Sequence, residues 1–205
     1  SVEVTFEEGS KLESIGSACF VGLNGYTAIF DPDDETAYSA FAQAGYQVSL
    51  AGRKLPQDET FVYGWVGKDS VQIIGLKDSG KEKPDITIPD TAGSDEQSYQ
   101  VVGIGDSVFA GTANADTDAN ITLTNVVLGA NLKYISSNAF KYCTYLTNVD
   151  FSRADKLERI GSNAFYDTKA VASWDLSACE KLTTVDTGAF NYTKTSITIK
   201  LPANI

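Results

Sequence analysis

A phrase that recurs every 25 residues constrains this chain more than any other feature of its sequence. Its regular copies end in Ala-Phe at Phe140, Phe165 and Phe190, and looser copies end at Phe20 and Phe109. An isoleucine or valine stands five residues before each of these phenylalanines. A leucine precedes that residue by three positions in four of the five copies. A fixed period of this length indicates a repeat protein.

A single repeat buries too few apolar side chains to offset the conformational entropy lost when its backbone is ordered. Neighbouring repeats must therefore complete each other's core, as in solenoid proteins. We expect Leu157, Ile160, Ala164 and Phe165 to stack in columns on their counterparts. The residue before each phenylalanine should be small because the backbone turns inward there.

Short segments that alternate apolar and polar residues precede most of the repeat leucines, a pattern typical of half-buried strands. They are residues 4–6, 149–151 and 174–176, and a further copy begins at 199–201. We expect one strand per repeat, followed by an irregular or helical return. The predicted fold is an α/β repeat, a solenoid of short parallel strands.

The phrase L-x-x-I-G-x-x-A-F, followed by C-x-x-L as at Cys143 and Leu146, resembles the BspA-like leucine-rich repeats of bacterial surface and secreted proteins. Residues 85–89, leading through 99–105, are similar to the N-terminal lead-in of such arrays. The resemblance covers about residues 1–30 and 84–205. It implies a leucine-rich-repeat solenoid at the cell surface or outside the cell, acting in recognition or adhesion.

Residues 1–50 depart from regular repetition and are predicted to be the C-terminal end of an upstream repeat array. Asp31 and Pro32 are a favourable helix start, and residues 33–44 are expected to be helical. Gly45 should end this helix before residues 46–50 return as a strand. This helix and strand form a predicted terminal βα element.

The rest of the chain is predicted to contain a linker and a second array. Residues 51–60 are polar and form the expected linker. Residues 61–65 and 71–76 alternate around a glycine-containing turn, which indicates a β-hairpin. We predict a second array over 61–205, with the hairpin as part of a cap (61–90) and repeats over 91–205.

Charge and composition exclude several classes of function. The chain has 16 Lys and Arg against 27 Asp and Glu, a formal net charge of −11, which disfavours nucleic acid and anionic membrane surfaces as partners. It contains no histidine, which excludes Ser-His-Asp and Cys-His catalysis and the usual histidine-containing metal sites. No apolar run approaches the roughly 20 residues of a membrane span. No signal peptide is recognisable, so any targeting element is expected to lie outside this segment.

An insertion between Phe109 and the next strand carries oxygen-bearing side chains at every second position over residues 114–120. Calcium loops begin in this way, but Ala119 and Asn125 occupy the places of the required glycine and acidic residue. The alternatives are a calcium loop and a solvated surface loop, and the pattern favours the second. We predict no metal and no cofactor.

Asp150 and Asp175 occupy equivalent outward positions in adjacent repeats and should lie about one strand spacing apart, roughly 5 Å. That separation suits the carboxylate pair of a retaining glycosidase. An open sheet has no walls to exclude water, however, so a solvated acidic ladder is the favoured interpretation. Cys143 and Cys179 are expected to fill the core as small apolar groups. We therefore predict that the chain is not an enzyme.

Two surfaces are candidates for binding a host or bacterial surface protein or a glycan. Tyrosine provides rigid contact area at interfaces, although the rings could instead brace the returns over the core. A rival to recognition is a structural spacer within a larger surface or secreted protein. The candidate residues are Tyr142, Tyr145, Tyr166 and Tyr192 on the returns, and Asn148, Asp150, Ser173 and Asp175 on the strand face.

Overall fold

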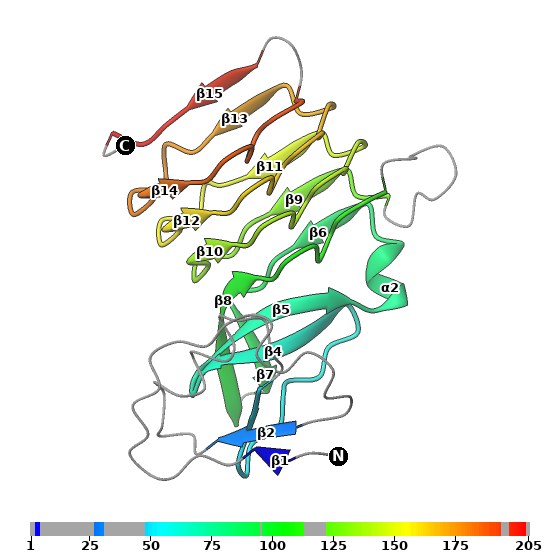
Figure 1. Ribbon diagram of the computed structural model, residues 1–205, viewed down its shortest axis with the longest axis vertical. Coiled ribbons are helices and arrows are strands. Elements are labelled where there is room, and N and C mark those ends of the chain that lie inside the picture. Colours follow the sequence, from blue (N-terminus) through cyan, green and yellow to red (C-terminus); the bar gives the residue numbers. More distant parts are fainter. Residues whose placement is uncertain are drawn as a thin grey trace.

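Two rows of short parallel strands run along the C-terminal two thirds of the molecule (Figure 1). The computed structural model describes residues 3–4, 27–30, 48–94, 96–112, 122–193 and 197–203. The expected helix at 33–44 and the insertion at 114–120 lie outside the described residues. Near the N-terminus a three-stranded parallel sheet has the order β1-β2-β3, formed by Glu3–Val4, Thr27–Phe30 and Val48–Leu50.

A β-hairpin lies between this sheet and the repeats. Strands β4 (Phe61–Gly67) and β5 (Ser70–Leu76) pair antiparallel, and β5 pairs parallel with β8 (Gln97–Ile104). Strand β7 (Thr91–Ser94) pairs antiparallel with β8, and the helical turn α2 (Asp78–Lys81) follows β5. The inward side chains of the hairpin are buried, as the alternating pattern requires. The hairpin is therefore continuous with the sheet that carries the repeats.

Each repeat contributes two strands, and they form two parallel rows. The first row continues from β8 through β10 (Tyr134–Ile135), β12 (Arg159–Ile160) and β14 (Thr184–Val185). The second row contains β6 (Asp85–Thr87), β9 (Asn125–Val127), β11 (Asn148–Asp150), β13 (Ser173–Asp175) and β15 (Thr198–Lys200). In this row β6, β9 and β11 form one sheet, and β13 pairs with β15 in another.

The expectation of one strand per repeat was wrong, whereas the returns, expected to be irregular or helical, are irregular. The isoleucine or valine of each phrase itself lies in a second, two-residue strand, such as Arg159–Ile160. Within residues 122–193 the segments between strands are turns and extended connections without a helix. A two-residue strand is too short to produce the alternation from which strands are recognised in a sequence.

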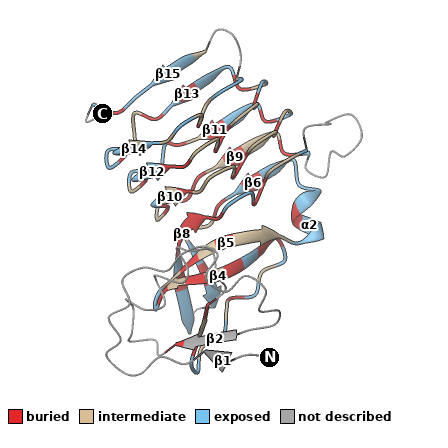
Figure 2. Ribbon diagram, in the orientation of Figure 1, coloured by how far each residue is buried: buried red, intermediate tan, exposed pale blue. Residues whose placement is uncertain are grey.

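The repeated phenylalanines stack ring over ring along the core, which confirms the expected columns. Successive rings of Phe109, Phe140, Phe165 and Phe190 have centroids 4.7, 5.1 and 5.4 Å apart and are within 8° of parallel. Leu157, Ile160 and Ala164 are fully buried, as are their counterparts one repeat earlier, and Figure 2 shows that buried segments recur from repeat to repeat. The backbone follows the same stacking, since the Phe140 N–H donates to the Ala164 carbonyl at 2.7 Å.

One contact between repeats requires a glycine. Gly103 in β8 is the register partner of Tyr134 in β10, and the tyrosine ring lies over the glycine. A Cβ atom at Gly103 would lie 2.2 Å from two ring carbons of Tyr134. The Tyr134 hydroxyl also donates to Gln72 Oε1 at 3.2 Å, which fixes the ring in this position.

Replacing Phe165 with alanine should lower the free energy of unfolding by about 3–5 kcal/mol, because it removes a fully buried ring stacked on both sides. The control is Phe190→Ala, which truncates a partly buried ring stacked on one side and should cost less. Urea unfolding followed by circular dichroism measures both. Equal losses would contradict a core built on the stacked column.

The Gly103→Ala variant should be destabilised by about 1–3 kcal/mol, because the added methyl group overpacks against the Tyr134 ring. A double-mutant cycle with Tyr134→Ala checks the cause. The second substitution removes the obstructing ring, so Gly103→Ala should cost clearly less in that background. Additive losses would show that the ring is not the obstacle.

Candidate binding surfaces

The strand-face candidates lie on β11 and β13, which belong to separate sheets. The continuous ladder of strands that was expected to hold Asp150 and Asp175 one strand spacing apart is therefore interrupted between β11 and β13. Asn148 is exposed, and its side-chain amide donates to Asn125 Oδ1 at 2.7 Å on the neighbouring strand. Ser173 is also exposed and lies opposite Thr198 of β15.

The two strand-face carboxylates close the turns that follow their strands. Asp150 Oδ1 accepts the backbone N–H of Ser152 at 2.8 Å, and Asp175 Oδ1 accepts that of Ser177 at 3.0 Å. The Ser177 hydroxyl donates to Asp175 Oδ1 at 2.5 Å, and Lys200 Nζ lies 3.2 Å from Asp175 Oδ2. Aspartate side chains commonly stabilise turns by such local bonds.

These bonds change the acidity of Asp175 in a definite direction. The Ser177 hydroxyl, then the Ser177 backbone N–H and the Lys200 ammonium, lower the pKa of Asp175 to about 2. A general acid of a glycosidase requires the opposite shift, because it must hold its proton near neutral pH. The environment of Asp175 therefore favours a turn-forming role.

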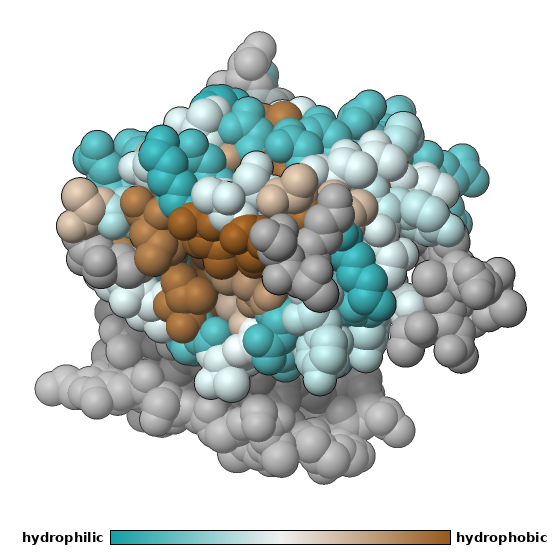
Figure 3. All heavy atoms as spheres, turned by 90° about the horizontal axis from the view of Figure 1, so that it is seen from above, coloured by the Kyte–Doolittle hydropathy of each residue, from teal (hydrophilic) through white to brown (hydrophobic). Residues whose placement is uncertain are grey.

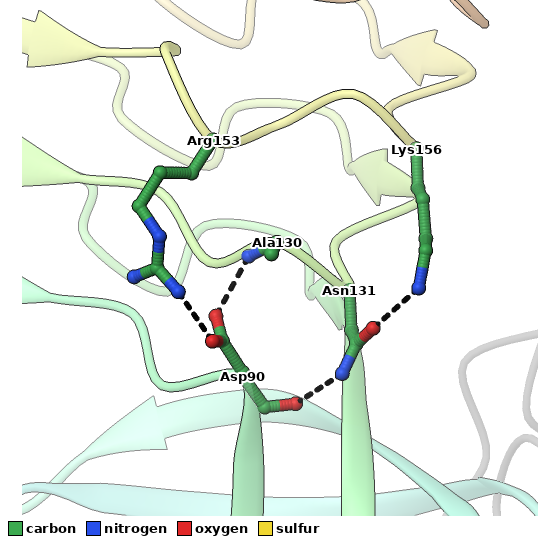
Figure 4. Close-up of polar contacts among 5 residues, drawn as sticks. All are labelled: Asp90, Ala130, Asn131, Arg153 and Lys156. Atoms are coloured by element: carbon green, nitrogen blue, oxygen red, sulfur yellow. Dashed lines mark hydrogen bonds and ion pairs between the residues drawn. The ribbon is translucent and has the colours of Figure 1, made fainter.

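A polar network on the turns after the second-row strands joins three successive repeats (Figure 4). The Asp90 carboxylate accepts the Ala130 N–H at 2.7 Å and pairs with Arg153. The Asp90 carbonyl accepts a bond from the Asn131 side chain at 3.0 Å, and Asn131 Oδ1 accepts one from Lys156 at 2.7 Å. The network bonds these turns to one another and so stabilises their stacking. It was not predicted from the sequence because its members come from different repeats.

Three of the four candidate tyrosines come together on the return side of the repeats. The rings of Tyr142 and Tyr166 are edge to face with centroids 5.6 Å apart, and those of Tyr166 and Tyr192 are tilted at 5.0 Å. The Lys141 ammonium lies 5.0 Å from the centroid of Tyr142 and 5.3 Å from that of Tyr166. We call Tyr142, Tyr166 and Tyr192 the tyrosine row.

The fourth candidate, Tyr145, does not join the tyrosine row. Its side chain is 51 % exposed, and it makes no ring contact with another aromatic side chain of the described residues. Exposure increases along the row itself, from half-buried rings at Tyr142 and Tyr166 to 67 % exposed at Tyr192. Desolvation, then the neighbouring Tyr192 and Tyr142, raises the pKa of Tyr166.

The backbone beneath the row is unusual for tyrosine. Tyr142 has φ = 62° and Tyr192 has φ = 55°, in the left-handed region. Asp167 holds the equivalent position in the intervening repeat, with φ = 63°. Glycine, asparagine and aspartate adopt this conformation most readily, whereas bulky side chains are uncommon there. The local conformation therefore does not account for tyrosine at these two positions.

The two described cysteines are buried in the core, as expected. The Cys143 thiol donates to the Phe109 carbonyl at 3.0 Å, and burial raises the pKa of Cys143 to about 12. Burial likewise raises the pKa of Cys179 to about 11.

Among the described residues, no three Cys, Asp or Glu side chains are grouped so that they could hold a metal ion. No helix in the described part of the chain has the length and apolar character to cross a membrane.

In each row, every repeat contributes one short parallel strand, and the repeat leucines are buried in columns. This arrangement defines a leucine-rich-repeat protein. The family model of the BspA type leucine rich repeat region matches residues 104–205 with six copies. Through this region the chain belongs to the BspA-like leucine-rich-repeat family. The matching model is that of a repeat scaffold, and no catalytic family is indicated.

Solved structures with a similar fold include a leucine-rich repeat protein from Bacteroides capillosus. It is 18 % identical with a TM-score of 0.57, over 70 % of this chain and 96 % of that one. A leucine rich cell surface protein from Faecalibacterium prausnitzii is 24 % identical with a TM-score of 0.49, over 74 % of this chain and 44 % of that one. Comparison with curated proteins gives no significant match.

Replacing Ser177 with alanine should raise the pKa of Asp175 from about 2 toward its ordinary value of 3.8, because the hydroxyl donor is lost. A lowered carboxyl pKa stabilises the fold fully above the unfolded pKa, and this stabilisation is lost as the pH falls through the folded pKa. In the variant this stabilisation should be smaller, and its loss should be complete at a higher pH. Carboxyl-carbon NMR titration measures the midpoint.

The matched control for this titration is Ser152→Ala in the turn after β11, where the Asp150 side chain accepts the backbone N–H of Ser152 and no bond from its hydroxyl. It should leave the Asp175 midpoint unchanged. An unchanged midpoint in Ser177→Ala would show that the hydroxyl does not set the acidity of Asp175.

Proposed function

We propose that this chain is a non-catalytic recognition module of an extracellular or cell-surface protein. It binds a protein or glycan ligand through the tyrosine row. The observation that carries the proposal is the row itself, three tyrosines from successive repeats that form a continuous aromatic surface ending in the exposed ring of Tyr192. Tyrosine combines a rigid apolar ring with a hydroxyl that can bond to a ligand, and it is enriched at interfaces for that reason.

The tyrosine row is a better candidate than the strand face because its polar groups are available. No hydroxyl of the row is hydrogen-bonded to another described residue. On the strand face, by contrast, Asp150 and Asp175 already accept bonds within their turns, and Asn148 bonds to Asn125. A ligand there would have to compete with bonds that hold the repeats together.

Bracing of the returns is the alternative role of these rings. It accounts for the half-buried Tyr142 and Tyr166, whose rings contact each other. It does not account for Tyr192, which is 67 % exposed at a backbone position that suits asparagine or glycine better. Backbone strain that a smaller residue would relieve is often retained for function.

A structural spacer remains the second candidate function, and the Asp90 network favours it. That network and the stacked rings join consecutive repeats into a rod that could separate other modules. In this account residues 1–50 end an upstream array, residues 51–60 link it to the second array over 61–205, and the hairpin of 61–90 caps that array. The spacer role requires no ligand.

The proposal is tested by Tyr142→Asn and Tyr192→Asn, singly and together. Asparagine removes the ring while suiting the left-handed backbone, so the fold should be retained. The purified chain is screened at high micromolar concentration against arrays of matrix proteins and glycans. We expect binding to at least one ligand class and a loss of about tenfold or more in the double variant.

The matched control for the binding test is Tyr145→Ala, an exposed tyrosine outside the row. It should bind as the unmodified chain does. Binding that survives the double variant would place the site elsewhere. If the chain binds no ligand on either array, the recognition proposal is contradicted and the spacer role is left.

A further inference from the structure

Lys141 is half-buried, yet its ammonium bonds to no oxygen of the residues that the structure describes. Seen from above, along the stack of repeats, the molecule places hydrophilic residues around its apolar side chains (Figure 3). The two other half-buried cations of the described residues each have an oxygen partner. Arg53 donates to the Lys68 carbonyl at 2.7 Å, and Lys156 donates to Asn131 Oδ1 at 2.7 Å. Lys141 is therefore a cation whose bonding capacity is unused.

Two tyrosine rings hold the Lys141 ammonium in place. It lies 5.0 Å from the ring centroid of Tyr142 and 5.3 Å from that of Tyr166. Both distances are within the roughly 6 Å over which the face of an aromatic ring attracts a cation. This attraction offsets part of the lost hydration but supplies no opposite charge. Because the ammonium is partly removed from water, an anion beside it would be attracted more strongly than at an exposed lysine.

The repeat itself does not require a lysine at this position. The residue after the repeat phenylalanine is alanine, tyrosine or asparagine in the neighbouring repeats. The backbone is fixed on both sides by bonds between repeats. The Lys141 carbonyl accepts the Gly111 N–H at 2.8 Å. The Tyr142 N–H donates to the Tyr166 carbonyl, also at 2.8 Å. A rigid backbone therefore carries a cation that the repeat pattern does not require.

The charges around Lys141 favour a ligand with few negative charges. Asp167, in the next repeat, pairs with Lys169 at 2.8 Å, and the whole chain has a net charge of −11. These charges would repel a densely charged polyanion or a glutamate-rich peptide, whereas a single carboxylate needs only one cation. The hydroxyls of Tyr142 and Tyr166 are bonded to no described residue, so they can bond to neutral hydroxyl groups beside that carboxylate.

We propose that Lys141, with Tyr142 and Tyr166, binds the carboxylate of an acidic sugar, a sialic or uronic acid within an otherwise neutral glycan. This inference rests on the proposed function and names the class of ligand that the tyrosine row takes. The Lys141 ammonium donates to the carboxylate, and the tyrosine hydroxyls bond to hydroxyl groups of the sugar. Charge-assisted bonds are stronger than neutral ones, so Lys141 provides the discrimination between acidic and neutral sugars.

Binding of matched acidic and uncharged sugars tests the ligand class. Sialyllactose and a hyaluronan tetrasaccharide are each compared with their carboxyl methyl esters by isothermal titration calorimetry. At least one acid should bind about tenfold or more tightly than its ester, because the ester lacks the charge that Lys141 requires. Raising the salt from about 0.1 M to about 1 M should weaken binding of the acid but not of the ester. Acids that bind no better than their esters would overturn the proposal.

Substitutions of Lys141 test which residue provides the discrimination. Lys141→Gln removes the charge and should lower the affinity for the acid about tenfold, with little change for the ester. Lys141→Arg keeps a cation that packs on aromatic rings and should retain the preference for the acid. The matched control is Lys133→Gln, which removes the charge of an exposed lysine just before β10 and should bind as the unmodified chain does.

The failure of this inference can be told apart from the failure of the proposed function. A ligand whose binding is lost in Tyr142→Asn but unchanged in Lys141→Gln would contradict the acidic sugar and leave recognition by the tyrosine row intact. Tighter binding of a glutamate-rich peptide than of either acidic sugar would show that the ligand is not a glycan. The proposed function fails instead when the chain binds nothing on the arrays of matrix proteins and glycans.

Discussion

The stacking of one repeat on the next is the interaction on which the rest of this structure depends. Phenylalanine rings lie face to face along the core, and the backbone N–H beside each ring bonds to the following repeat. Neither contact exists within a single repeat, so each repeat derives its stability from its neighbours. The last repeat lacks such a neighbour among the described residues, and its apolar side chains are exposed there.

The same stacking explains why polar residues that suggest chemistry serve the fold. Asp150 and Asp175 each accept the backbone N–H two residues further on, which closes the turn after a strand. Asp90 reaches two later repeats through its carboxylate. A carboxylate that holds a turn is stabilised in its charged form, as the low pKa of Asp175 reflects. These side chains therefore belong to the scaffold.

Stacking also builds extended surfaces. Each repeat adds one residue to a row on the surface. The centroids of aromatic rings from successive repeats therefore lie about as far apart on the surface as those of the stacked phenylalanines in the core. The tyrosine row arises in this way on one side of the rod, although Tyr166 comes from a different repeat position than Tyr142 and Tyr192.

The recurrence of particular side chains was enough to predict the repeat period, the family, the columns of Leu157, Ile160 and Phe165 and the burial of Cys143. Three features emerge only in the folded chain: the second strand of each repeat, the separation of Tyr145 from the tyrosine row and the Asp90 network. A two-residue strand is too short to give a pattern, and contacts between repeats depend on how the turns are superimposed.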